Sequence, residues 1–157
     1  MNFKNDDDSL YLEDLHVGQR FTSSVYELSE EQIKAFAAEF DPQPFHLDNA
    51  AAQNSFFHGL AASGWHTAAI TMRLLVTGKM RFGVGMIGLG VEIEWPLPVR
   101  PGDRLHVESE ITEIAPSRTK ADRGVVTVRN VTFNQDGAEV QVLISKVLVF
   151  RRSKKSD

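Results

Sequence analysis

SGWHTAAITMRLLVTGK, residues 63–79, is the stretch from which the fold of this 157-residue chain can be worked out. Ser63 is suited to cap the start of a helix, and Gly78 is suited to end it. The residues between them are apolar on nearly every side, and a helix of that kind is usually surrounded by the rest of its domain. We therefore expect a long buried helix at the centre of the fold.

Downstream of this helix, apolar residues recur at every second position, which is typical of strands. The alternation runs through GLGVEIEWPLPV and DRLHVESEITEI, and RPGD at 100–103 marks a turn between them. Two further strands, RGVVTVRNVTF and AEVQVLISKVLVF, are joined by NQDG, a hairpin signal. At least four antiparallel strands after a long helix predict an α+β fold, with a curved antiparallel sheet packed on that helix. An open sheet leaves an edge strand to be covered, so we expect a homodimer or a higher homo-oligomer.

Upstream, QRFTSSVYEL predicts a short strand, LSEEQIKAFAAEF a helix and DNAAAQNSF a second, short helix. Ser29 and Gln32 have the spacing of a capping box at the start of the first helix. Pro42 disfavours the α conformation at Asp41, so this helix should end there. Its apolar residues have helical spacing and predict one buried stripe: Ile33, Phe36, Ala37 and Phe40.

The composition excludes several classes of protein. The formal charge is -4 and the pI about 5.7, whereas a nucleic-acid-binding domain usually carries a basic face. The chain has no cysteine, which excludes disulfides and thiolate chemistry. The N-terminal stretch lacks the apolar region of a signal peptide, and no apolar run is long enough to span a membrane. We expect a cytoplasmic protein that binds neither nucleic acid nor a membrane.

The chain is predicted to form one domain, residues 10–152, between a disordered acidic segment, 1–9, and a flexible basic tail, 153–157. The cations near the C-terminus are expected to be a solvated end, and a contact with a phosphate-bearing ligand is the alternative: Arg151, Arg152, Lys154 and Lys155.

FDPQPFHLD, residues 40–48, follows the first helix with two prolines, an acid and an imidazole. Both prolines fix φ and restrict the residue before them, so such a turn can bring Asp41 and His46 to face the same point. A carboxylate beside an imidazole is an acid–base pair that works near neutral pH. The alternative interpretation is structural, with Asp41 capping the next turn and His46 lying at the surface or packed.

The same stretch resembles the D-x-N-P-x-H hydratase motif of the MaoC-like dehydratases, a family that includes the (R)-specific enoyl-CoA hydratases. Asp41, Pro44 and His46 match the motif in register. The resemblance continues through FFHGLAASGWHTAAITMRLL and PVRPGDRLHVESEI and covers roughly residues 11–150. It implies a single hot-dog domain, a curved antiparallel sheet wrapped around a long central helix, which agrees with the fold expected above.

The resemblance implies an enzyme of acyl-CoA and fatty acid metabolism, a hydro-lyase that adds water reversibly to a trans-2-enoyl thioester. Asp41 and His46 would activate the water, and coenzyme A would be present only as part of the substrate, with no other cofactor. The thioester oxygen gains negative charge and needs a fixed donor. The N–H of Gly64, at the positive start of the central helix, is our candidate.

Two positions depart from the family pattern. Gln43 stands where the family has Asn, and Ser63 precedes Gly64 where the family often has His. Ser63 caps the helix, holds Asp41 through its hydroxyl, or does both. These departures keep two other functions open: a hot-dog acyl-CoA thioesterase and a non-catalytic acyl-thioester-binding domain.

Four apolar residues are candidates for the wall of an acyl pocket, with ordinary core packing as the alternative: Phe56, Phe57, Trp65 and Met86. His66 is expected to be a hydrogen-bonded core histidine and His58 a solvated loop residue. No set of side chains has metal-ligand spacing, so we predict no metal. The glycine-rich RFGVGMIGLG does not lie between a strand and a helix, which argues against dinucleotide binding.

Overall fold

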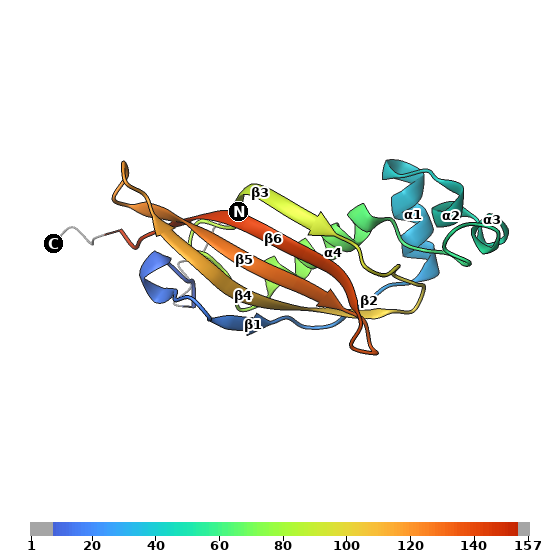
Figure 1. Cartoon of the computed structure of the whole chain (residues 1–157), viewed down its shortest axis with the longest axis horizontal. Helices are drawn as coiled ribbons and strands as arrows, with labels where there is room; N and C mark the ends of the chain where they lie inside the picture. The colour runs from blue at the N-terminus through green and yellow to red at the C-terminus, as the bar shows by residue number, and fades with distance from the viewer. Residues whose placement is uncertain (1–7, 154–157) are drawn as a thin grey trace.

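The computed structural model describes residues 8–153 (Figure 1). The predicted disordered segment and flexible tail lie almost wholly outside these residues. In chain order the elements are the 3-10 helix η1 (Leu12–Asp14), the strands β1 (Arg20–Thr22) and β2 (Tyr26–Glu27), the helices α1 (Glu30–Phe40), α2 (Pro44–Leu47), α3 (Asn49–Gln53) and α4 (Gly64–Thr77), and the strands β3 (Ile87–Glu94), β4 (Arg104–Pro116), β5 (Arg123–Phe133) and β6 (Glu139–Phe150).

One antiparallel sheet forms most of the molecule, which confirms the predicted α+β class. Its order is β1-β4-β5-β6-β3, and β2 pairs with the start of β4. The long strands β4, β5 and β6 follow one another through hairpins, while β3 pairs with β6 and forms an edge of the sheet. The three short helices α1–α3 are gathered at one end of the sheet (Figure 1).

The helix α4 packs against β4 and has the predicted ends, with Ser63 as its N-cap and Gly78 as its C-cap. Ile70, Leu74 and Leu75 bury one side of it in the hydrophobic core, together with valines from β5 and β6. Replacing a core leucine or isoleucine of this kind with Ala typically costs about 2–5 kcal/mol.

The expectation that α4 is surrounded on all sides is wrong for a single chain. Trp65 is 60% exposed, and Met72 and Val76 are each 43% exposed. Leu89 and Val91 of β3 are also more than half exposed. The helix therefore has apolar residues on two sides. One side is buried in the core of this chain, and the other is exposed.

The region before α4 differs from the sequence prediction in two places. QRFTSSVYEL forms two short strands, β1 and β2, instead of one. The segment after α1 contains an additional helical turn, α2, with Pro44 at its first position, where the missing N–H is no loss. The capping box of Ser29 and Gln32 is confirmed, but the stripe is only partly buried, because Phe40 is 64% exposed.

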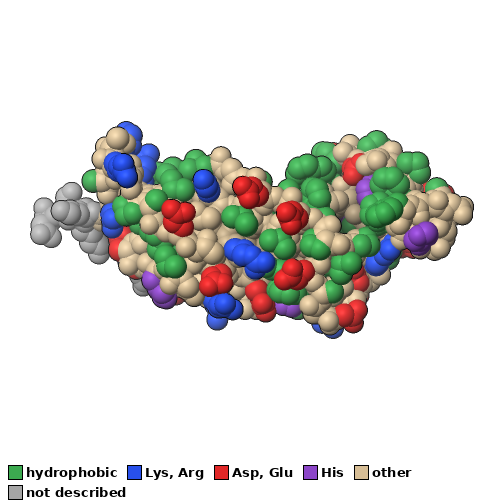
Figure 2. Space-filling view, in the orientation of Figure 1, with side chains coloured by type: hydrophobic (Ala, Val, Ile, Leu, Met, Phe, Trp, Pro, Cys, Tyr) green, Lys and Arg blue, Asp and Glu red, His purple; other side chains and the backbone are tan. Residues whose placement is uncertain are grey.

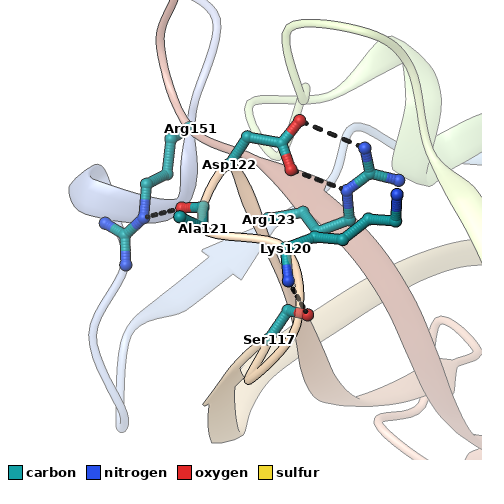
Figure 3. A network of polar contacts seen from close by, with 6 residues as sticks. All are labelled: Ser117, Lys120, Ala121, Asp122, Arg123 and Arg151. Atoms are coloured by element: carbon teal, nitrogen blue, oxygen red, sulfur yellow. Dashed lines mark hydrogen bonds and ion pairs between the residues drawn. The ribbon is translucent and has the colours of Figure 1, made fainter.

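Residues of the hairpin between β4 and β5 form hydrogen bonds with Arg151, which directly follows β6 (Figure 3). The guanidinium of Arg123 pairs with Asp122, and the backbone N–H of Arg151 donates to the Asp122 carbonyl. Arg152 pairs with Asp14 at 2.8 Å. Both tail cations that the structure describes therefore lie at the end of the sheet opposite α1–α3 (Figure 1). Within residues 8–153, no helix is long and apolar enough to cross a membrane.

Candidate active site

The end of α1 and the short helix α2 bring Asp41 and His46 together. Asp41 is the C-cap residue of α1, and Pro44 starts α2 three residues later. His46 Nε2 lies 3.3 Å from Asp41 Oδ2, with the imidazole almost fully buried and the carboxylate mostly buried. The two prolines thus make a tight turn whose two ends face each other.

The other ring nitrogen of His46 fixes the orientation of the imidazole. Nδ1 lies 2.6 Å from the backbone carbonyl oxygen of Ala61, which can only accept a hydrogen bond. A neutral His46 therefore carries its proton on Nδ1 and turns the lone pair of Nε2 toward Asp41. Two acceptors that face each other at this distance are suited to share a donor molecule such as water.

Asp41 is held in its ionised form by its neighbours. Burial on its own raises the pKa of this carboxyl, but hydrogen bonds from Ser63 and Gln43 and the nearby His46 outweigh burial and leave the pKa below its ordinary value. The Gln43 amide donates to Asp41 Oδ1 at 2.6 Å. The longer stem of Gln43 therefore still allows its amide to contact the acid.

Ser63 makes both of the contacts considered from the sequence. Its hydroxyl donates to Asp41 and accepts from the backbone N–H of Trp65 at the start of α4. Gly64 follows as the first residue of the helix. Its N–H makes no hydrogen bond to any residue in the described range 8–153, which leaves a donor at the positive end of a 14-residue helix.

A cavity of about 470 Å³ opens beside this pair. Asp41, Gln43, His46 and Gly64 line it on the polar side. Thr67 also lines the cavity. The other lining residues are apolar or aromatic: Phe45, Phe56, Phe57, Ala62, Trp65, Trp95, Pro96, Leu97, Pro98 and Val99. Hydrophobic side chains also gather on part of the surface at this end of the molecule (Figure 2). Such a cavity has the size and lining of a small-molecule site.

Three of the four candidates for the acyl pocket, Phe56, Phe57 and Trp65, line this cavity. Met86 does not, and packs instead against the hydrophobic core. Sequence reasoning missed the segment 95–99, which supplies one wall. Its two prolines after a strand are the same signal of a stiff, extended segment that was recognised in residues 42–44.

The other histidines lie outside the cavity lining. His58 is exposed, as expected. His66 is buried and stacks on Phe36 with ring centroids 4.4 Å apart, but its Nδ1 has no hydrogen-bond partner, so the expectation of a hydrogen-bonded histidine is wrong. Burial lowers its pKa. Among the residues described, no group of three or more His, Asp or Glu could hold a metal ion.

Arg100 supports the loop of residues 54–60, which carries Phe56 and Phe57. Its guanidinium donates to the carbonyl oxygens of Phe57, Gly59 and Leu60. This cation is thus engaged in holding the loop.

Comparisons with known proteins agree with this geometry. The family described as MaoC like domain matches residues 15–134. A MaoC-like dehydratase from Rhodospirillum rubrum is 57% identical in sequence, covers 93% of this chain and all of its own, and superposes with a TM-score of 0.92. The (R)-specific enoyl-CoA hydratase of Aeromonas caviae is 33% identical over 79% of this chain and 87% of its own. The protein YdeM of Bacillus subtilis is 33% identical over 82% of this chain and 91% of its own.

Proposed function

The chain belongs to the MaoC-like dehydratase family and has its hot-dog fold, and from this premise we propose that it is a hydro-lyase that adds water reversibly across the double bond of a trans-2-enoyl-CoA. The observation that carries the proposal is the approach of His46 Nε2 to Asp41 Oδ2 at 3.3 Å. Both residues line an apolar cavity that also contains the unpaired N–H of Gly64. A polar pair, a free donor and an apolar wall are the parts that hydration of an enoyl thioester needs.

The pair activates one water molecule. With Asp41 ionised and Nε2 of His46 unprotonated, a water bound beside both atoms donates one hydrogen to each acceptor and turns its oxygen lone pair to the substrate. Because hydrogen bonds from Ser63 and Gln43 lower the pKa of Asp41, this carboxylate stays ionised. His46 Nε2 therefore takes the proton, and the adjacent carboxylate stabilises the imidazolium that results.

The remaining atoms follow from this assignment. The water oxygen bonds to C3, the C2–C3 π electrons move toward the thioester, and its oxygen gains negative charge. The Gly64 N–H donates to that oxygen, at the positive end of α4. The proton held on His46 then passes to C2, which restores the neutral imidazole and completes the addition of one water. Dehydration runs through the same steps in reverse.

The protein acts as a homodimer. The edge strand β3 pairs with β6 on one side and has no strand on its other side among the described residues. Exposed apolar side chains lie on this strand and on the central helix: Leu89 and Val91 of β3, and Trp65, Met72 and Val76 of α4. A second copy of the same chain suits both features, because its own β3 pairs with the edge and its own α4 covers the exposed side chains.

The first experiment follows the loss of enoyl-thioester absorbance with crotonyl-CoA and a longer 2-enoyl-CoA. Asp41→Asn and His46→Ala are each expected to lower kcat/KM by roughly 10²–10⁴-fold, because each removes one member of the acid–base pair. The matched controls are Asp136→Asn and His16→Ala, which change an exposed acid and an exposed histidine outside the cavity lining. Both controls should keep the wild-type rate.

A wild-type protein that binds acyl-CoA but consumes neither substrate would contradict the proposal. Release of free coenzyme A thiol in the same assay would then indicate a thioesterase, and binding without any reaction would indicate an acyl-thioester-binding domain. Equal activity of Asp41→Asn and the wild type would place the chemistry elsewhere in the cavity.

A further inference from the structure

Trp95 is one of the residues that line the cavity. It follows the end of β3, and its indole ring packs directly on Gly64, where an added Cβ would lie only 2.6 Å from a ring carbon. The ring also meets Trp65 edge to face, with ring centroids 5.4 Å apart. The indole therefore stands beside the residue whose N–H, in the proposed reaction, receives the thioester oxygen.

The indole is anchored from behind by buried polar groups. Trp95 Nε1 donates to Gln141 Oε1 at 3.0 Å, and Gln141 Nε2 donates to Thr71 Oγ1 at 2.9 Å. The hydroxyls of Thr71 and Thr132 are 2.7 Å apart. Gln141, Thr71 and Thr132 are all fully buried. The anchor thus joins the end of β3 to β6, β5 and α4.

The donors and acceptors of Trp95, Gln141 and Thr71 allow only one orientation of the Gln141 amide. The indole N–H can only donate, so it must face the carbonyl oxygen of the Gln141 amide. The amide nitrogen must then face Thr71, whose hydroxyl accepts. Moving the indole away would leave a fully buried amide oxygen without a partner, which is unfavourable. Trp95, which is 40% exposed, is therefore a fixed wall, in contrast to Phe56, which is 90% exposed at the loop and has no such anchor.

The indole bounds the cavity that contains the catalytic pair. Trp95 lines this cavity together with Asp41, His46 and Gly64, whereas Val91 and Met72 lie outside its lining. A bulky ring at this place takes up room that an acyl chain would otherwise fill.

We propose that Trp95, positioned by Gln141, is the specificity-determining residue that limits the substrate to short 2-enoyl thioesters, about the size of crotonyl. The proposal rests on the proposed hydratase function. Since the indole touches Gly64 and lines the cavity beside Asp41 and His46, it reduces the room left there for carbons beyond C3. Gln141 acts through Trp95 and is a positioning residue.

The test measures kcat/KM for 2-enoyl-CoAs of four, six, eight and ten carbons. The wild type should prefer the four-carbon substrate. Trp95→Ala should raise the ratio of ten-carbon to four-carbon activity by roughly tenfold or more, since each methylene accommodated in an apolar site is worth about that much. Gln141→Leu should shift the same ratio in the same direction by less, with crotonyl-CoA still consumed. Phe56→Ala is the comparison variant, and we expect it to change KM by a similar factor for substrates of every chain length.

A double-variant cycle separates positioning from a general structural effect. If Gln141 acts through the indole N–H, Gln141→Leu should not change the length ratio further in Trp95→Phe, which lacks that N–H. Independent, additive shifts would overturn the positioning role. A folded, active Trp95→Ala with the wild-type length profile would overturn the whole inference, as would a wild type that prefers ten carbons.

The failure of this inference is distinguishable from the failure of the proposed function. A wild type that consumes none of the four substrates contradicts the hydratase proposal alone. The role of Trp95 is then tested by the binding of saturated acyl-CoAs of the same lengths. Binding is measured through the fluorescence of Trp95 in the variant Trp65→Phe, in which it is the one remaining tryptophan. Affinity that falls as the chain lengthens supports the wall, and affinity that rises steadily overturns it.

Discussion

At the scale of single residues, Ser63 connects the fold to the chemistry. Its hydroxyl accepts from the first turn of α4 and donates to Asp41, so one oxygen both starts the central helix and lowers the pKa of the acid. A serine is suited to this because a hydroxyl offers a donor and two acceptor lone pairs. The departure from the family pattern at this position therefore keeps a polar contact to the acid.

Ser63→Ala is expected to raise the pKa of the Asp41 carboxyl. The folded protein holds this pKa below its ordinary value, and removing one of the hydrogen bonds that lower it brings it back up. NMR titration of the Asp41 carboxyl carbon measures the change. Ser29→Ala is the matched control, because it also removes an N-cap serine, at a typical cost of about 0.5–2 kcal/mol, but at the start of α1, away from Asp41. A carboxyl pKa that is the same in all three proteins would contradict the role of Ser63.

His66 predicts a dependence of stability on pH. Burial lowers its pKa in the folded protein below 6.5, the ordinary value. Between the folded and the ordinary pKa the unfolded chain binds more protons, so the free energy of unfolding falls as the pH drops below 6.5. Urea unfolding at pH 7.5 and at lower pH should show this fall in the wild type and a smaller fall in His66→Phe. His58→Gln changes an exposed histidine and should keep the wild-type fall.

At the scale of elements, the cavity is built from segments that carry no long helix or strand. The turn 41–46, the loop 54–60 and the segment 95–99 supply most of its lining. Each has its own restraint: prolines in the first and third, and in the second the guanidinium of Arg100 on three carbonyl oxygens. His58 and Gly59 in this loop both have positive φ, a conformation that such external hydrogen bonds help to maintain.

Arg100→Lys is expected to loosen the loop that carries Phe56 and Phe57. An ammonium group cannot reach three carbonyl oxygens in the planar arrangement that a guanidinium allows. We expect faster amide hydrogen exchange in residues 54–60, a KM raised roughly tenfold and a free energy of unfolding lower by about 2 kcal/mol. Arg104→Lys is the control, because the Arg104 side chain makes no hydrogen bond within the described chain. Unchanged exchange in Arg100→Lys would contradict the role of Arg100.

At the scale of the whole molecule, the single chain leaves several large apolar side chains of β3 and α4 exposed. Exposed apolar residues lie on β3, an edge of the sheet, and on α4, and Trp65 of that helix meets Trp95 edge to face. Apolar patches of this kind in soluble proteins usually mark a contact with another protein. The proposed homodimer accounts for the patch and the edge together.

Val91→Glu is expected to convert the dimer into a monomer. It places a charge on an exposed position of the edge strand β3, where the second copy would have to bury it at high cost. Sedimentation equilibrium of the wild type and the variant gives the masses directly. Val17→Glu, which changes another exposed valine far from β3 in the chain, should remain a dimer. A monomeric wild type, or a dimeric Val91→Glu, would contradict the proposed interface.

Local signals predicted much of this protein from the sequence. The capping box of α1, its end at Asp41 and both ends of α4 depend on residues within a few positions of one another. The strands were predicted because their alternation repeats over many residues. The approach of Asp41 to His46 also follows from a short segment with two fixed prolines. The match to the hydratase motif then indicated a catalytic role for this pair. Their catalytic roles stay predictions.

The tertiary structure decided which distant residues complete the site. Trp95 meets Gln141 across 46 positions, Gln141 meets Thr71 across 70, and Arg100 reaches the Phe57 carbonyl across 43. No local pattern specifies such contacts, because each depends on how the sheet and α4 are brought together. The exposed side of α4 was missed for the same reason. An apolar sequence determines that a surface should be covered, but only the packed chain shows which part of it the chain covers itself.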